Sequence, residues 1–315
     1  MTEKDNGGVR VVTIDANSDG QRIDNFLLRE LKGVPKSRIY NLLRRGEVRV
    51  NKGRVKAEHR LQSGDLVRIP PVRARAEGEA PDVSVALSDR LANAILFEDE
   101  GLIVIDKPAG LAVHGGSGVN LGLIEALRVM RPQAKFLELV HRLDRDTSGC
   151  IMVAKKRSAL LTLHEALRGD GIDKRYLALA AGTWPRHRRR VEAPLEKNTL
   201  RSGERVVRVS AEGKAAVTEF AVLEAFAQAT LIEASPITGR THQIRVHAQY
   251  AGHPLAGDEK YGEKEMNSRF REMGLRRLFL HAHTLAFDWQ GRRLQLKAEP
   301  HQELQSFLKT LRNAL

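Results

Sequence analysis

Cysteine is almost absent from this chain of 315 residues, which contains a single thiol, Cys150. One thiol cannot form a disulfide within the chain, nor a zinc site built from several cysteines. The apolar neighbours Ile151 and Met152 predict that this thiol is buried. These observations exclude a disulfide-stabilised fold and a cysteine-rich metal domain.

Long apolar stretches are also missing. No segment approaches the roughly 20 consecutive apolar residues that a membrane-spanning helix requires. Residues 1–10 contain acidic side chains and lack the apolar core of a secretion signal. Hydrophobic residues still make up 42% of the chain, which is enough for a sizeable core, and the length favours two domains. We expect a soluble cytoplasmic protein.

Acidic side chains are too few to balance the basic ones, and the net charge is +13. Such an excess favours a polyanionic partner, with nucleic acid the first candidate, an anionic membrane surface the second and simple solubility the alternative. The charge is concentrated, because residues 22–72 contain 13 Lys and Arg against 5 Asp and Glu, a net +8. This concentration favours a phosphate-binding module.

That basic module has a regular pattern. Apolar residues at helical spacing predict one helix ending near Gly33 and a second from Pro35 to Gly46. A strand follows at residues 48–50, the turn 51–53 leads into a returning strand from Val55, and a last strand covers residues 66–69. We predict a flexible arm or short edge strand over residues 1–16, an α+β RNA-binding module over 17–72 and a linker over 73–90.

Residues 91–315 are rich in short apolar segments joined by tight turns. Predicted strands outnumber predicted helices, which favours a mostly antiparallel mixed sheet with helices packed on it. We expect strands at residues 95–97, 102–105, 137–143, 150–154, 176–180, 217–223, 230–234 and 278–285, and helices at 121–130, 158–167, 241–251 and 302–312.

The segment His141–Gly149 combines two carboxylates, two arginines, a hydroxyl pair and a glycine between apolar strands. A hairpin turn needs Asp or Asn and Gly, but not this density of functional groups. A charged surface turn is the alternative interpretation. We place Asp144 at the end of a strand, where a rigid element would hold it as a nucleophile or a base.

A second such segment is Thr238–His247. We predict Thr241 as the N-cap of a helix and Arg245 one turn further in, where the helix can direct it at a carboxylate. Taken alone, a surface helix with solvated arginines is the simpler interpretation.

The histidines do not predict a metal site. His242 and His247 are five residues apart and therefore do not share a helix face as a metal-binding pair would. His281 and His283 would share a strand face, but the sequence offers no clear third ligand.

Three weaker segments complete the set. The glycine-rich stretch Asp106–Gly118 is neither a Walker loop nor a dinucleotide fingerprint, so an irregular loop is the default interpretation. Lys174–Tyr176 opens a strand, where a tyrosine is more often a core or rim residue. Trp184 and the basic run Arg186–Arg190 would suit RNA contact or, equally, a solvated turn.

Together, these segments resemble the RluA family of pseudouridine synthases. His141–Gly149 is similar to the sequence around that family's catalytic aspartate, and the basic module resembles an S4 RNA-binding domain, which precedes the catalytic domain in one branch. One departure is Asp106, where relatives commonly carry Asn before Lys-Pro. The other segments similar to the family, in its expected order, are Asp106–His114, Lys174–Tyr176 and Thr238–His247. Three further segments are similar to the branch of the family that modifies bacterial large-subunit rRNA, namely Gly33–Ser37, Gly46–Lys52 and Tyr250–Pro254.

The resemblance implies a role for each matching residue. Asp144 is the nucleophile, Tyr176 packs against the target base and Arg245 pairs with the nucleophile. The further substrate-binding residues are Arg142, which fills the space left by the flipped base, Leu280, which closes the pocket, and Arg240 and His242. The basic module adds the RNA-binding candidates Lys36, Ser37, Arg38, Arg44, Arg45, Arg49 and Lys52.

The implied reaction breaks the N-glycosidic bond of a uridine and rebuilds it to C5 of the same base. No electrons leave and no atoms are added, so we expect neither a cofactor nor a metal. The base must leave its stack, which suits a locally unpaired RNA. Whether Asp144 attacks C1′ or C6, or acts through a glycal, stays open.

The partner expected for such an enzyme is rRNA of the large subunit or its precursor, with no membrane, no obligate protein partner and a monomeric chain. A non-catalytic RNA-binding ribosome-assembly factor is the main alternative, although it leaves the segments around Asp144 and Arg245 unexplained. A glycosidase-like hydrolase would need a second working carboxylate, for which Asp146 is the near candidate.

Overall fold

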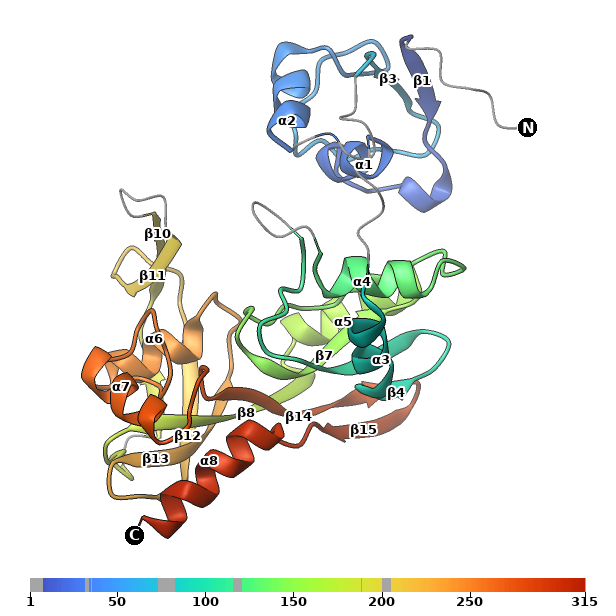
Figure 1. Ribbon diagram of the computed structural model, residues 1–315. Helices are drawn as coiled ribbons and strands as arrows, with labels where there is room; N and C mark the ends of the chain where they lie inside the picture. The colour runs from blue at the N-terminus through green and yellow to red at the C-terminus, as the bar shows by residue number, and fades with distance from the viewer. Residues whose placement is uncertain are drawn as a thin grey trace. The chain divides into compact units, whose positions relative to one another are not determined.

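The computed structural model describes residues 8–31, 34, 36–72, 83–115, 121–187, 189–199 and 205–314, except for the side chains of residues 17, 36, 37, 199 and 205. The chain divides into two compact units, Met1–Asp82 and Val83–Leu315 (Figure 1). Each unit has a hydrophobic core of its own. None of the helices in the described ranges is long and apolar enough to cross a bilayer.

The first unit packs two helices on a small antiparallel sheet with strand order β1-β3-β2. Its buried side chains include Phe26 and Leu27 from one helix, Ile39 and Leu42 from the other, and Val67 from the sheet. Helical spacing puts these apolar residues on facing stripes, as predicted. The elements are β1 Arg10–Thr13, η1 Ala16–Ser18, α1 Ile23–Glu30, α2 Lys36–Arg45, β2 Arg49–Val50 and β3 Leu66–Ile69.

Three details of this unit can be compared with the sequence. Of the two alternatives for residues 1–16, the edge strand is the correct one over Arg10–Thr13, which pairs with β3. The predicted turn is present, and both Asn51 and Lys52 have positive φ, as a two-residue hairpin turn requires. The returning strand from Val55 is wrong, because the next strand after the turn is β3.

The second unit is built on one large sheet of ten strands. The main strand order is β4-β5-β7-β14-β8-β13-β12-β9, with β15 paired to β14 and β6 to β7. Among the described strands, β7 and β14 form the parallel pair, and the other neighbours are antiparallel. The predicted α+β class, an S4-like module followed by a mostly antiparallel mixed sheet, is confirmed.

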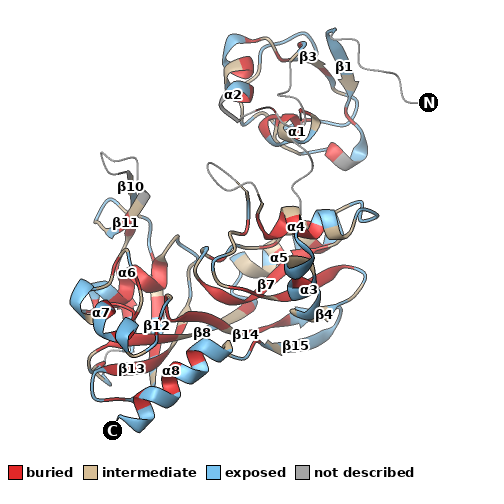
Figure 2. Ribbon diagram, viewed as in Figure 1, coloured by how far each residue is buried: buried red, intermediate tan, exposed pale blue. Residues whose placement is uncertain are grey.

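The helices cover both faces of this sheet. Side chains that alternate along β5, β7 and β8 belong to different core clusters, as the period of two requires. One face packs against α3, α4 and α6, while the other packs against α5, α7 and α8. Figure 2 shows the central strands as an almost continuous buried layer. Helical bounds are α3 Val85–Asn93, α4 Leu123–Met130, α5 Arg157–Arg168, α6 Gln243–Tyr250, α7 Lys264–Glu272 and α8 Gln302–Asn313.

The strand that joins the two halves of the sheet comes late in the chain. β14 lies between β7 and β8 and contacts β7 in parallel register at His281 and Ala282. The strands are β4 Ile95–Glu98, β5 Leu102–Lys107, β6 Glu138–Leu139, β7 Ser148–Ala154, β8 Ile172–Ala181, β9 Arg190–Glu192, β10 Leu195–Thr199, β11 Arg205–Val209, β12 Val217–Ala225, β13 Ala229–Pro236, β14 Leu280–Trp289 and β15 Arg292–Lys297.

Several elements differ from the prediction. The linker expected over residues 73–90 contains the start of α3, capped by the Ser84 hydroxyl, while residues 73–82 lie outside the described part. Helix α7 and strands β9, β10, β11 and β15 were not predicted, because charged residues interrupt their apolar pattern. The buried thiol of Cys150 is confirmed, and burial raises its pKa to about 12.

Candidate active site

A cavity of about 710 Å³ in the second unit contains all seven catalytic and substrate-binding residues that were predicted. They come from parts of the sequence as much as 138 positions apart, and strand pairing and helix packing bring them together. The seven lining residues are Arg142, Asp144, Tyr176, Arg240, His242, Arg245 and Leu280.

Asp144 lies at the mouth of this cavity, in an irregular segment between β6 and β7. Its predicted place at the end of a strand is wrong, because β7 begins only at Ser148. A tight turn holds the aspartate instead, with the Thr147 amide donating to the Asp144 carbonyl at 3.2 Å. The Asp144 side chain is 17% exposed, so its carboxylate is accessible from the cavity.

The loop around Asp144 is tied to the loop after β5 by a buried lysine. The ammonium of Lys107 donates to the carbonyls of Pro108, Leu111 and Arg145, at 2.8 to 3.1 Å. Burial, aided by the charge of Arg277, lowers the pKa of Lys107 to about 7, while the nearby carboxylates of Asp146, Asp144 and Asp106 oppose that shift. The Gly110 amide also donates to the Arg145 carbonyl, so the residue next to Asp144 is held twice.

The other end of the loop is fixed by a close approach of two strands. Gly149 has a φ of +107°, and a Cβ there would lie 2.3 Å from the Ala282 carbonyl oxygen of β14. Only glycine allows this contact, which sets the parallel register of β7 and β14. The glycine predicted as part of a turn therefore serves as a strand contact.

Arg245 lies on α6 with one nitrogen directed at the aspartate. Its Nη1 is 3.6 Å from Asp144 Oδ2, while its Nε and Nη2 each donate at 2.7 Å to the carboxylate of Asp258. The Tyr261 ring lies under the guanidinium, 4.9 Å from its centre. Burial alone lowers the pKa of Arg245, but the bonds and charges of Asp258 and Asp144 outweigh it and hold that pKa above its ordinary value.

Asp258 was missed by sequence reasoning. Its side chain is completely buried, and it also accepts amide hydrogens from Lys260 and Tyr261. It follows Arg245 by 13 residues, across the end of a helix and a loop, so no local periodicity indicates the pair.

His242 adds a second nitrogen near the same oxygen. Its Nε2 lies 3.8 Å from Asp144 Oδ2, and its Nδ1 lies 2.7 Å from the Tyr261 hydroxyl. His242 is the N-cap of α6, so the predicted cap Thr241 is wrong by one residue. The histidine has a φ of +54°, an unfavourable left-handed conformation for a residue with a side chain.

Tyr176 and Leu280 form an apolar wall of the cavity. They lie on the adjacent strands β8 and β14 and are 9% and 3% exposed. Burial, with a further contribution from the Asp144 charge, raises the pKa of Tyr176 well above its ordinary value. The phenol therefore stays neutral and offers a flat surface to a ring.

The two remaining arginines lie at the exposed rim. Arg240 donates from Nε to the Ala215 carbonyl, which holds its side chain along the edge of the cavity. The Arg142 side chain is exposed and makes no hydrogen bond or ion pair with any residue in the described ranges, so it is available to a ligand.

A wider cleft of about 1360 Å³ opens from the other side of Asp144. It shares Arg142, His242 and Arg245 with the smaller cavity and continues along further basic side chains, Arg90, Arg276 and Arg277. The carboxylate of Asp144 therefore lines both cavities, and the wider cleft carries acidic side chains such as Asp146 and Glu303 as well as the arginines.

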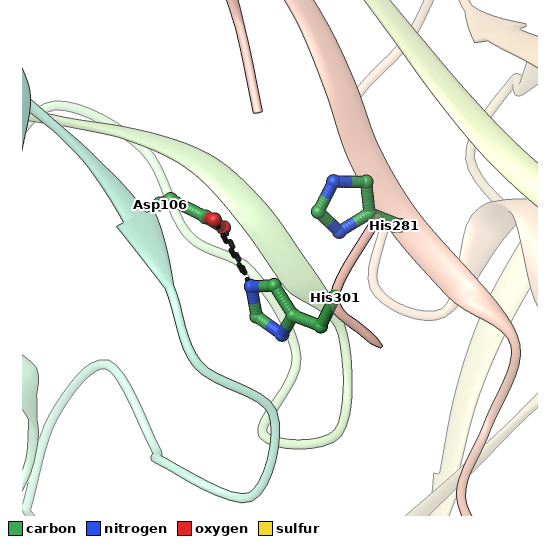
Figure 3. Close-up of side chains that lie close together, drawn as sticks. All are labelled: Asp106, His281 and His301. Atoms are coloured by element: carbon green, nitrogen blue, oxygen red, sulfur yellow. Dashed lines mark hydrogen bonds and ion pairs between the residues drawn. The ribbon is translucent and has the colours of Figure 1, made fainter. Parts of the chain in front are cut away.

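Another cluster at this cleft contains a carboxylate and two imidazoles, Asp106, His281 and His301 (Figure 3). His301 and Asp106 are the partners that the sequence did not reveal for His281. Their possible ligand atoms lie within 4.8 Å of one another. His301 Nε2 is 3.0 Å from both oxygens of Asp106.

Hydrogen bonds already account for both nitrogens of His281. Its Nε2 donates to the Ala298 carbonyl, and its Nδ1 accepts from the Ser148 hydroxyl, which in turn accepts from Arg277. Burial lowers the pKa of His281 to about 4, so the ring is neutral near pH 7. A metal ion would have to displace Ser148 from the ring and lie beside the Arg277 guanidinium, which opposes binding.

The backbone amides at the glycine-rich segment bind a carboxylate of the chain itself, and not an external phosphate. One carboxylate oxygen of Glu125 accepts from the amides of Gly115 and Gly122, at 2.9 and 3.1 Å. Residues 116–118 of the predicted segment lie outside the described part. Trp184 is 2% exposed and packs on Phe220, so its predicted alternative contact with RNA is wrong.

In the first unit, the described RNA-binding candidates lie at the surface. Arg38, Arg44, Arg45, Arg49 and Lys52 are exposed, while the side chains of Lys36 and Ser37 lie outside the described part. Arg45 faces Glu47 at 3.9 Å, whereas Arg44 donates to Asn41 Oδ1 at 2.8 Å and Arg49 donates to the carbonyls of Gly46 and Lys52.

A pocket that brings Asp144, Arg245 and Tyr176 together on a mixed sheet, in a chain that also contains an S4-like module, has the arrangement expected of the pseudouridine synthase class of RNA-modifying enzymes. Residues 101–250 match the model of the RNA pseudouridylate synthase family, and residues 21–67 match the S4 domain. The chain belongs to the RNA pseudouridylate synthase family and is therefore an isomerase of RNA.

Curated relatives extend this similarity over nearly the whole chain. The protein named Ribosomal large subunit pseudouridine synthase C of Haemophilus influenzae is 55% identical, over 98% of this chain and 97% of its own length. The protein of the same name in Escherichia coli K12 is 57% identical, over 97% of this chain and 98% of its own.

Solved structures agree with this assignment. Human RNA Pseudouridylate Synthase Domain Containing 4 superposes with a TM-score of 0.61 at 29% identity, covering 72% of this chain and 96% of its own. The human domain-containing protein 1 gives a TM-score of 0.54 at 26% identity, covering 66% and 83%.

Proposed function

We propose that this protein converts specific uridines of bacterial large-subunit rRNA to pseudouridine. The names and full-length similarity of the relatives from Haemophilus influenzae and Escherichia coli support this substrate. The observation that carries the proposal is the convergence of Asp144, Arg245 and Tyr176 on one cavity.

In this proposal Asp144 is the nucleophile that detaches the base from its ribose. Arg245 places an opposite charge 3.6 Å from Oδ2 of that carboxylate and so attracts and orients it. Tyr176 and Leu280 hold the detached uracil by its face while it rotates, and C5 then takes the place of N1 in the bond to C1′. An apolar, largely buried wall suits this step, since it lets a flat ring turn without losing it to water.

The target nucleotide must leave its stack to reach Asp144, which costs a few kcal/mol. Arg142 is exposed at the rim and fills the space that the flipped base leaves. Arg240 and His242 line the entrance from the other side. The cleft along Arg90 and Arg276 accommodates the flanking strand, whose phosphates attract guanidinium groups.

The first unit contributes affinity through its exposed basic side chains, chiefly Arg38, Arg44, Arg45, Arg49 and Lys52. Lys36 and Ser37 stay candidates from the sequence alone. We further propose that the chain acts in the cytoplasm as a monomer, without a metal or cofactor. In support of a reaction without a cofactor, the isomerisation consumes no electrons and no added atoms.

The deciding experiment maps pseudouridine in the rRNA of cells with and without this protein. We expect a small set of large-subunit positions to lose the modification in its absence and to regain it when the wild-type chain, but not Asp144→Asn, is restored. An unchanged map, with the protein still bound to rRNA, would instead identify an RNA-binding assembly factor.

A further inference from the structure

Two hydrogen bonds lead from strand β11 to His242, whose ring lies 3.8 Å from the carboxylate of Asp144. The Val207 amide donates to the Tyr261 hydroxyl at 2.9 Å, that hydroxyl lies 2.7 Å from His242 Nδ1, and His242 Nε2 faces Asp144. Val207 is 6% exposed and Tyr261 is 6% exposed, so water does not compete freely for these groups.

The direction of each bond follows from counting protons. An amide can only donate, so the Tyr261 oxygen accepts from Val207. That hydroxyl then has one proton left to place, and within the described ranges its remaining hydrogen-bond partner is His242 Nδ1. If Nδ1 accepts, a neutral imidazole must carry its hydrogen on Nε2.

Both rings are in the protonation state that this count requires. Burial raises the pKa of Tyr261 above its ordinary value, so the phenol keeps its proton. Burial also lowers the pKa of His242, aided by the charges of Arg245 and Lys260, while Asp144 and Asp258 oppose the shift. The imidazole is therefore neutral near pH 7.

We propose that Tyr261 fixes His242 as the neutral tautomer with its hydrogen on Nε2, so that His242 positions Asp144 for attack. The role rests on the proposed function of Asp144. Nε2 of His242 and Nη1 of Arg245 both face the same carboxylate oxygen, Oδ2. The two nitrogens lie 3.8 and 3.6 Å from Oδ2, just beyond hydrogen-bond distance, and in this proposal they close on it when RNA binds, which orients the carboxylate and leaves Oδ1 for the nucleotide.

A neutral donor suits this position better than a second cation. Arg245 already supplies one full charge at 3.6 Å, and another would hold electron density on the aspartate and weaken it as a nucleophile. A neutral N–H adds direction without adding charge.

The strained backbone of His242 supports a role for its side chain. It has the left-handed conformation, φ +54°, and makes no side-chain capping bond to α6, which an N-cap residue usually provides. Asparagine would tolerate this conformation better. Histidine and asparagine both adopt this conformation more readily than most residues, but only histidine has a ring that can bond Tyr261 through one nitrogen and face Asp144 with the other.

The tautomer can be read directly by two-bond ¹H–¹⁵N spectra of the full-length protein labelled at histidine nitrogens, with His242 assigned from the His242→Asn spectrum. We expect His242 to carry its hydrogen on Nε2 in the wild type and to become a mixture of tautomers in Tyr261→Phe. His247 is the internal control, because its Nε2 donates to the Ala193 carbonyl far from Tyr261 and should not change. A hydrogen on Nδ1 of wild-type His242 would overturn the proposal.

A matched pair of variants tests the positioning role. His242→Gln keeps an N–H at about the reach of Nε2, whereas His242→Asn suits the left-handed backbone but is too short to reach Asp144. We expect single-turnover rates to fall about 10- to 100-fold for Asn, as for loss of one hydrogen bond to a charged group, and Gln to recover most of that rate. RNA affinity should stay within a few fold in both.

Equal losses in the two variants, or a more active Asn variant, would show that His242 serves the backbone and not Asp144. Failure of the proposed function is distinguishable from these outcomes, since wild-type protein would then form no pseudouridine while the tautomer spectra remained interpretable.

Discussion

The two units of this chain use charge in different ways. In the first unit, basic side chains such as Arg38 and Arg44 lie exposed, and the Arg45–Glu47 pair is long and solvated. The Arg22–Asp24 pair of that unit is short, at 2.7 Å, but its arginine is still 39% exposed. In the second unit, the decisive charges are nearly buried and tightly paired, with Arg245 2.7 Å from an entirely buried Asp258.

This difference leads us to expect that charges of the first unit affect mainly RNA affinity, and buried charges of the second unit mainly the reaction rate. Exposed ion pairs contribute about 0–1 kcal/mol each, so a surface built from them tolerates single losses and acts as a sum. Breaking a buried pair costs roughly 3–5 kcal/mol, because it leaves a charge without a partner. We therefore expect single substitutions to be severe in the pocket and mild on the module.

The largest effect is expected at the nucleophile. Asp144→Asn keeps the shape of the side chain but removes its nucleophilic charge, so product formation should be abolished while RNA affinity changes by a few fold at most. Single-turnover assays and filter binding on the same RNA would measure both. Turnover near the wild-type rate would sink the assignment of Asp144.

The next largest effect is expected at the buried ion pair. Arg245→Ala should slow single-turnover chemistry by about 100-fold or more, and Arg245→Lys should recover only part, because an ammonium cannot make the two parallel bonds to Asp258. Adding Arg245→Ala to Asp144→Asn should cost little beyond Asp144→Asn alone, since the two residues share one step.

Asp258→Asn tests the partner of Arg245 in this buried ion pair, a residue that positions the arginine without contacting Asp144. Loss of its charge should lower the free energy of unfolding by about 3 kcal/mol, measured by urea denaturation, and should reduce the rate with it. Exposed Asp288→Asn is the control, because its pair with Arg293 is long and solvated. Equal stability of the two variants would contradict the importance given to burial.

A smaller effect per charge is expected for the first unit as a whole. A chain lacking residues 1–82 should still fold, since the second unit has separate cores, but it should bind RNA more weakly and with a flatter dependence of log affinity on log salt. An unchanged slope would show that the module does not contact phosphates.

The smallest effect is expected for one exposed arginine. Arg38→Ala should weaken binding of all RNA sequences about equally and reduce the salt slope by about 1, with no change in the rate of bound RNA. Arg293→Ala removes the same charge from β15 and should leave the slope unchanged. A large loss of RNA affinity in Arg38→Ala that depended on the RNA sequence would contradict the expected difference between the two units.

The sequence predicted most of the fold for a physical reason. Alternation of apolar residues marks the strands of the central sheet, and helical spacing marks α1, α5 and α8. It failed at β10, β11 and β15, where charged residues interrupt the pattern and pairing to a neighbour provides the stability. Helix α3 was assigned to a linker because only Leu91 within it is fully buried.

The sequence predicted only those pocket residues that lie in short contiguous motifs rich in functional side chains. Asp144 and Arg245 lie in dense polar motifs, and the structure brings both to one cavity. Asp258 and Tyr261 carry no such mark, because their importance arises from contacts across loops. Likewise, nothing local to Asp144 indicates that Lys107, 37 residues earlier, holds its loop.

The position of β14 has a consequence for how the protein is made. This strand, residues 280–289, separates the half-sheet β4-β5-β7 from the half-sheet β8-β13-β12-β9, yet it is among the last elements to leave the ribosome. Until it emerges, Leu280 and the strand contact at Gly149 are missing. The nascent chain then has a complete RNA-binding module but an incomplete pocket. Activity therefore begins only when translation is nearly complete.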